Sequence, residues 1–140
     1  MDANIFAMLV YIISLILGWI PYVYYGAWVF PLIVIVAIEK DSMFVKHHAT
    51  QAMAIYIVVA VLHIIVDIIY ATIMFSVYST PFSFLGATGG SVALSVISRI
   101  VGVLLTVAAI SGAVKAYQYE DYSVPLIGKI GNKIADYLVK

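Results

Sequence analysis

The chain has 140 residues with no net formal charge, 65% hydrophobic and 10% charged residues, and no cysteine. Soluble domains are about half apolar and about a quarter charged, so a soluble fold of this length could not bury so much Ile, Val, Leu and Tyr. We therefore expect a single all-α membrane domain over residues 1–140. The composition excludes disulfides and thiolate metal sites, and the balanced charge argues against nucleic acid as a partner.

The first part of the chain predicts two membrane helices, over about residues 5–20 and 22–38. The first apolar run has no basic start and no small-residue cleavage site, so we expect a retained helix and not a signal peptide. Pro21 ends this helix, and the Tyr and Trp residues around it are typical of a membrane interface. Pro31 predicts a kink or a tilt in the second helix.

The second part predicts two longer helices, over about residues 44–75 and 91–114, joined by an uncharged loop over 76–90. Asp41 or Ser42 can cap the first of them. The tail, over about 125–139, has apolar residues on one face and charged residues on the other. This pattern predicts an amphipathic helix on the membrane surface, in contact with lipid.

The basic residues predict the orientation of the four membrane helices. All of them except Arg99 lie in the 39–48 turn or after residue 114, whereas the Tyr-rich turn and the 76–90 loop have none. Cytoplasmic segments are enriched in Lys and Arg. We therefore expect a multi-pass protein of the cell membrane with both termini in the cytoplasm.

Three ionisable residues, His63, Asp67 and Arg99, lie within the expected third and fourth helices. With helix ends at 76 and 90, Asp67 and Arg99 are at equal depth, so we expect them to form an ion pair that His63 completes. Ionisable residues inside membranes also mark proton and ion pathways. A structural network and a transport site are therefore both open, and the structural interpretation is favoured.

Small residues recur along one face of the expected fourth helix, which permits close packing against another helix. We expect Gly102 to lie at a tight contact. The seam consists of Ser95, Ser98, Gly102, Thr106 and Ala109.

No residue pattern indicates a catalytic, cofactor-binding or metal-binding site. His47 and His48 are adjacent, so on a helix they point about 100° apart and cannot chelate one ion from one face. Phosphate-binding loops, nucleophile elbows and zinc-protease motifs are absent from the sequence. We therefore expect no enzymatic activity and no cofactor.

Several motifs follow one another in an order that resembles a known family. They are Pro31, the turn at 39–41, the stretch of Phe44, Val45, Lys46, His48, Gln51 and Ala52, and Pro125 to Ile127. The set is similar to that of the short four-helix prokaryotic membrane proteins related to the twenty-kilodalton subunit of Tic, the translocon at the chloroplast inner envelope. This resemblance implies four membrane helices, a cytoplasmic amphipathic tail and no enzymatic activity, and for the chloroplast member a role in protein import.

Two functions are carried forward from the sequence. The first is a small non-enzymatic membrane protein that acts by association, as a translocon-like or membrane-complex subunit with other membrane proteins or further copies of itself. The alternative is a proton- or ion-coupled carrier or channel that uses His63, Asp67 and Arg99.

Overall fold

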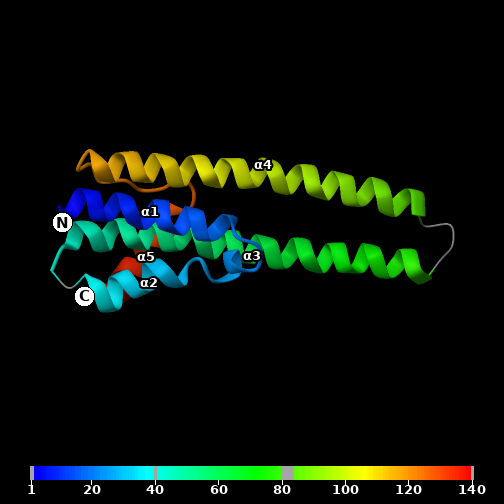
Figure 1. Ribbon diagram of the computed structural model, residues 1–140, viewed down its shortest axis with the longest axis horizontal. Helices are drawn as coiled ribbons and strands as arrows, with labels where there is room; N and C mark the ends of the chain where they lie inside the picture. The colour runs from blue at the N-terminus through cyan, green and yellow to red at the C-terminus, as the bar shows by residue number, and fades with distance from the viewer. Residues whose placement is uncertain (1, 40, 80–83, 140) are drawn as a thin grey trace.

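The computed structural model describes residues 2–39, 41–79 and 84–139, and every regular element in these residues is helical (Figure 1). This confirms the all-α prediction for the described part of the chain. The α-helices are α1 (Ala3–Trp19), α2 (Val29–Ile33), α3 (Met43–Ser79), α4 (Phe84–Tyr117) and α5 (Gly128–Leu138), with a 3₁₀ helix η1 (Val23–Gly26) and a π-helix η2 (Val34–Ile38).

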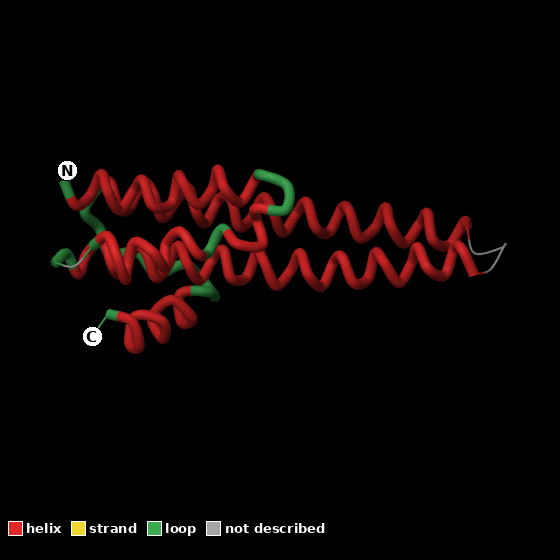
Figure 2. Tube along the Cα trace, turned by 60° about the horizontal axis from the view of Figure 1, so that its bottom comes forward, coloured by secondary structure: helices red, strands yellow, loops and turns green. Residues whose placement is uncertain are grey.

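The helices form a four-helix half and a two-helix arm (Figures 1 and 2). In the four-helix half, α1 and the η1–α2–η2 segment lie beside the first part of α3 and the last part of α4. Both termini lie at the outer end of this half. The arm, defined here as residues 68–79 and 84–98, is the part of α3 and α4 that extends beyond the other helices.

The expected second helix, over 22–38, is wrong as a continuous element. Tyr22 has a φ of 66°, in the left-handed region, which separates η1 from α1. Pro31 lacks the N–H that would bond to the preceding turn. Beyond it the helix widens, and the Glu39 N–H donates to the carbonyl oxygen of Val34 at 2.8 Å, five residues back. The return segment is therefore a short, irregular helix.

The expected loop over 76–90 is also wrong, because residues 76–79 and 84–90 are helical and only 80–83 lie outside the described residues. Hydroxyl groups just after the expected loop donate to backbone carbonyls of their own helix. The Ser91 hydroxyl donates to the carbonyl of Thr88 at 2.9 Å, and that of Ser95 donates to the carbonyl of Ser91 at 2.8 Å. The third and fourth helices consequently reach 37 and 34 residues.

The start of α3 is capped by side chains from the preceding turn. The Ser42 hydroxyl accepts from the Val45 N–H at 3.3 Å, which confirms Ser42 as a cap. A carboxylate oxygen of Glu39 accepts from the N–H groups of Ser42 at 2.8 Å and Asp41 at 3.0 Å. These two donors lower the pKa of the Glu39 carboxyl.

Within the described residues, two helices are long and apolar enough to cross a membrane, Met43–Val77 and Thr88–Tyr117. The first helix, α1, is apolar but has only 17 residues, and the return segment Val23–Ile38 is also short. Length and composition therefore support two of the four expected spans.

A tight helix contact joins α1 to α4, and it lies further along α4 than the sequence predicted. A Cβ at Gly112 would come within 2.6 Å of the Tyr11 ring. Ala109, Ala113 and Ala116 flank this contact and are buried. At Gly102, by contrast, an added Cβ would meet nothing within 4 Å. The expectation of a tight contact at Gly102 is therefore wrong within this chain, and of the predicted seam only Ala109 is buried.

We expect Gly112→Val to destabilise the protein by about 1–3 kcal/mol, because the new methyl groups overlap the Tyr11 ring and force α1 away from α4. Gly102→Leu is the matched control and should leave stability unchanged. Thermal unfolding of both variants in mild detergent measures the difference. Equal losses at the two positions would contradict this account of the α1–α4 contact.

Candidate functional site

A polar cluster on the first turns of α3 holds the C-terminal tail against the four-helix half. We call it the tail latch and define it as the side chains of His47, His48 and Gln51. Residues three and four apart lie on one face of a helix, so all three side chains can address the same neighbouring segment. That segment is the polypeptide from residue 120 to residue 132.

Gln51 is fully buried and contacts the tail at three points. Its amide oxygen accepts from the Val124 N–H at 3.2 Å, and its amide nitrogen donates to the side-chain oxygen of Asn132 at 2.9 Å and to the Gly128 carbonyl at 3.5 Å. A Cβ at Gly131 would lie 2.6 Å from that nitrogen. Glycine at this position therefore lets α5 approach α3 closely enough to form the latch.

The two histidines bind backbone carbonyls of the tail. His48 Nε2 lies 3.2 Å from the Glu120 carbonyl oxygen, and His47 Nε2 lies 3.2 Å from that of Tyr122. A carbonyl only accepts, so each Nε2 carries the proton that it donates. His48 Nδ1 can then accept from the Tyr11 hydroxyl at 3.4 Å. This arrangement occupies both histidines in structural contacts.

A tight turn after α4 directs the tail toward the latch. The Glu120 N–H donates to the Lys115 carbonyl at 3.0 Å and the Tyr119 N–H donates to that of Ala116 at 3.2 Å. This pair of bonds ends a helix with one left-handed residue, usually glycine. Here Tyr119 adopts a φ of 58°, and its ring packs against Phe44 with centroids 5.4 Å apart.

The tail helix α5 is amphipathic, as predicted, over a somewhat shorter range than 125–139. It packs against α3, with Gly128 and Gly131 buried at the contact. Two apolar side chains nearby stay outside: Leu126 is 98% exposed and Tyr137 is 82% exposed. The helix is thus docked on protein along one side and keeps apolar groups free to meet lipid, which stays a prediction.

The predicted network of His63, Asp67 and Arg99 does not form in the described residues. Asp67 accepts a hydrogen bond from the Tyr25 hydroxyl, and no Arg99–Asp67 ion pair is present. His63 Nδ1 bonds to the Val59 carbonyl at 2.8 Å, and the His63 ring stacks on Tyr24 with centroids 4.1 Å apart. The tyrosines of η1 take the places that Arg99 and His63 were expected to fill.

The register of α3 against α4 explains the missing ion pair. An added Cβ at Gly90 would meet Ile73 at 3.5 Å, so these two positions face each other. Counting away from that contact along both antiparallel helices places Arg99 opposite Ile64, beside His63 and not Asp67. The predicted pairing rested on helix ends at 76 and 90, and the true ends shift the register by nearly one turn.

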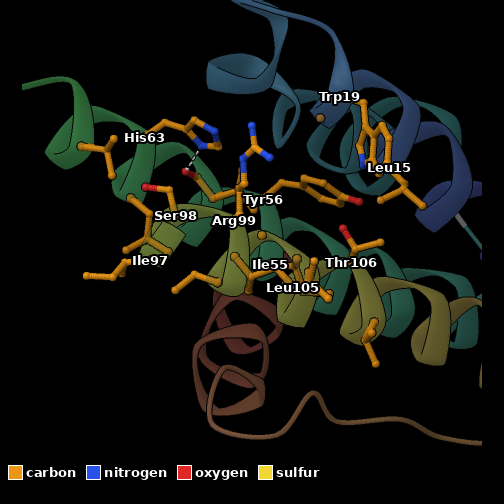
Figure 3. Close-up of a pocket in the computed structure, with 18 of the residues that line it drawn as sticks. Leu15, Trp19, Ile55, Tyr56, His63, Ile97, Ser98, Arg99, Leu105 and Thr106 are labelled. Atoms are coloured by element: carbon orange, nitrogen blue, oxygen red, sulfur yellow. Dashed lines mark hydrogen bonds between the residues drawn. The ribbon is translucent and has the colours of Figure 1, made fainter. Parts of the chain in front are cut away.

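Arg99 instead lines a groove of about 720 Å³ between α1, α3 and α4 (Figure 3). The close-up shows Arg99 between His63 on one side and Leu15 and Trp19 on the other, with the Tyr56 ring toward Leu15 and Trp19. Tyr56 is only 3% exposed, and its hydroxyl has no hydrogen-bond partner among the residues that the structure describes. Three members of the predicted seam, Ser98, Gly102 and Thr106, also line this groove.

Residues 2–131 match the model of the magnetosome magnetite crystal formation protein family. The chain belongs to this family. This assignment shows that the resemblance to the Tic-related proteins is wrong. The translocon role that the resemblance implied is therefore not supported either. The matched range includes the tail latch and most of the segment that it holds. No curated protein and no solved structure matches the chain.

Sequence reasoning singled out His48 and Gln51 within the motif at 44–52 but missed what they bind. Most of their partners are backbone groups, which carry no residue signature. The side-chain partners Tyr11 and Asn132 are far away in sequence. One signal was available: two glycines three residues apart, at 128 and 131, lie in the tail helix and indicate a close approach.

We expect Gln51→Leu to release the tail, because it leaves the Val124 N–H and the Asn132 amide without partners, a loss of about 1–3 kcal/mol. Hydrogen exchange of the backbone amides at 120–132 should accelerate, while exchange in α1 should change little. Gln118→Leu is the matched control, because Gln118 is exposed. Unchanged exchange in the tail of Gln51→Leu would show that the latch does not hold it.

Proposed function

We propose that this chain is a non-catalytic, multi-pass membrane protein that takes part in mineral crystal formation by assembling with further copies of itself. Membership of the magnetosome magnetite crystal formation family supports the biological role. The observation that carries the mode of action is the apolar arm of α3 and α4, which is too long for the bilayer alone to cover.

Helix length is the first step. The 37 residues of α3 extend about 55 Å at 1.5 Å per residue. The hydrocarbon layer is about 30 Å thick, and even a tilt of about 40° leaves roughly 42 Å along the membrane normal. The 17 residues of α1, by contrast, extend about 26 Å and match one bilayer.

Aromatic residues indicate which half lies in the bilayer. Trp19, Tyr22, Tyr24 and Tyr25 gather at the far end of α1, beside His63 and Asp67 of α3. Trp and Tyr are enriched where a membrane meets water. We place the four-helix half in the bilayer, with its aromatic belt at the outer interface and the arm beyond it.

The arm needs a cover, since its large side chains are exposed: Ile68 by 62%, Phe75 by 75%, Val92 by 58% and Val96 by 51%. A continuous apolar surface of this kind marks an interaction site. Residues 68–98 contain no Asp, Glu, Lys or Arg, so no charge selects a different partner. Two arms packed together would form a four-helix arrangement around a two-fold axis.

The basic residues set the orientation in this proposal. Lys46, Lys115, Lys129 and Lys133 are all on the terminal end of the four-helix half or in the tail, which we place in the cytoplasm. The arm then projects to the opposite side, which in a mineral-forming compartment is the lumen. An assembly of arms there would lie next to the growing crystal.

The orientation is tested with single cysteines, since the chain has none of its own. When the chain is expressed in the plasma membrane of a host cell without mineral-forming compartments, Gly86→Cys, exposed on the arm, should react with an impermeant thiol reagent in intact cells, and Asp41→Cys should not. Both should react after the membrane is permeabilised. Labelling at 41 without labelling at 86 would show that the topology is the opposite of the one proposed.

Self-association predicts disulfide-linked dimers when Val92→Cys is oxidised in native membranes, because facing arms bring the two copies together. Val36→Cys is the matched control, since Val36 is similarly exposed, by 64%, but lies on the four-helix half. Cross-linking at 36 equal to that at 92 would indicate random collision, and its absence at both would contradict pairing through the arm.

The role in crystal formation predicts a changed size distribution when iron oxide is precipitated from mixed ferrous and ferric iron inside liposomes that carry the protein. Electron microscopy of the crystals measures the effect. The Val92→Asp variant should still insert into the membrane but lose the effect on crystal size, because a carboxylate in the arm interface opposes pairing. Crystals that match those from protein-free liposomes would overturn the proposed role.

A further inference from the structure

We propose that the groove between α1, α3 and α4 binds one acyl chain of an anionic phospholipid, with the phosphate on Arg99. Binding at this groove does not depend on the role in crystal formation. It requires only that the four-helix half lies in a membrane.

The groove has the size and the lining that an acyl chain needs. Its volume of about 720 Å³ lies in the usual range for ligand sites, and most of its lining is aliphatic. Val103 and Val107 on its rim are 62% and 54% exposed, so the apolar lining continues onto the outer face of α4. An occupant can therefore enter sideways from the bilayer.

The charge of the groove selects an anion. Arg99 lines it, and among the described residues Arg99 has no ion-pair partner and no carboxylate lines the groove. The other basic side chain in the lining, His63, is held in place by the hydrogen bond between its Nδ1 atom and the Val59 carbonyl. A guanidinium in a largely apolar site needs an acceptor, and phosphate oxygens fit its paired donors.

The depth of Arg99 in the proposed membrane favours a phospholipid over a free anion as the ligand. Arg99 lies beside His63 in the groove, and His63 stacks on Tyr24 of the aromatic belt. Belt residues sit at headgroup depth. From Arg99 to Val107 the groove follows α4 for eight residues, about 12 Å toward the middle of the four-helix half. The phosphate headgroup therefore meets Arg99, and the acyl chain meets the apolar lining of the groove.

The test is native mass spectrometry of the full-length protein released from nanodiscs of phosphatidylglycerol or phosphatidylcholine. The wild type should retain one phosphatidylglycerol and little phosphatidylcholine. Arg99→Gln should weaken retention by roughly ten- to a hundredfold, the loss of one charge-assisted hydrogen-bonding group. Arg99→Lys should keep most of it. Gly102→Leu should also reduce retention, because its side chain fills the groove.

Two control variants separate this site from the alternatives. Lys129→Gln removes one positive charge from the tail and should not change retention. Tyr56→Phe removes the hydroxyl from the deeper part of the groove and should also have no effect, since an acyl chain offers it no hydrogen bond. Equal retention of both lipids, a loss with Tyr56→Phe that matches Arg99→Gln, or a bound fatty acid in place of the phospholipid would each overturn the proposal.

Discussion

The position of Tyr11 is the constraint on which the four-helix half depends. Its ring is 1% exposed and lies against Gly112, so it sets how closely α1 approaches α4. Its hydroxyl reaches His48 on α3, and His48 in turn binds the Glu120 carbonyl of the tail. One side chain therefore connects three helices and the start of the tail. A larger residue at 112 would displace the hydroxyl as well as the helix.

Much of the fold can be predicted from the sequence, and the wrong prediction of the ion pair has one physical origin. Apolar runs and their composition predict the helices and the amphipathic tail. They do not predict where α3 ends, because the Ser, Thr and Gly residues after position 76 suit a loop in water and a helix in an apolar setting equally well. That error moved the register, and the register decides that Arg99 lies beside His63 in a groove and not beside Asp67.

The motif at 44–52 illustrates what a short motif specifies. Its polar members, His48 and Gln51, satisfy backbone groups of the returning tail, so the motif describes how a helix holds a C-terminal segment. That requirement is structural and carries no information about a translocon. The match over residues 2–131 places the chain in a different family, and it does so across the whole bundle. Both proposals made above therefore rest on surfaces other than the latch.

These surfaces are the groove and the arm, and they lie at different depths relative to the proposed bilayer. The Tyr25 hydroxyl donates to Asp67 at the end of the four-helix half, and in the proposed arrangement this polar pair lies where the helices leave the membrane. The ion-carrier alternative stays a prediction, with its two charges now in different surroundings. On the membrane side of this level, the part of the groove from Arg99 to Val107 suits lipid. Beyond it, helices with exposed Phe75 and Val92 cannot remain in water. In the proposed arrangement, the same difference in helix length that leaves the groove facing lipid leaves the arm to be covered by a second copy of the chain.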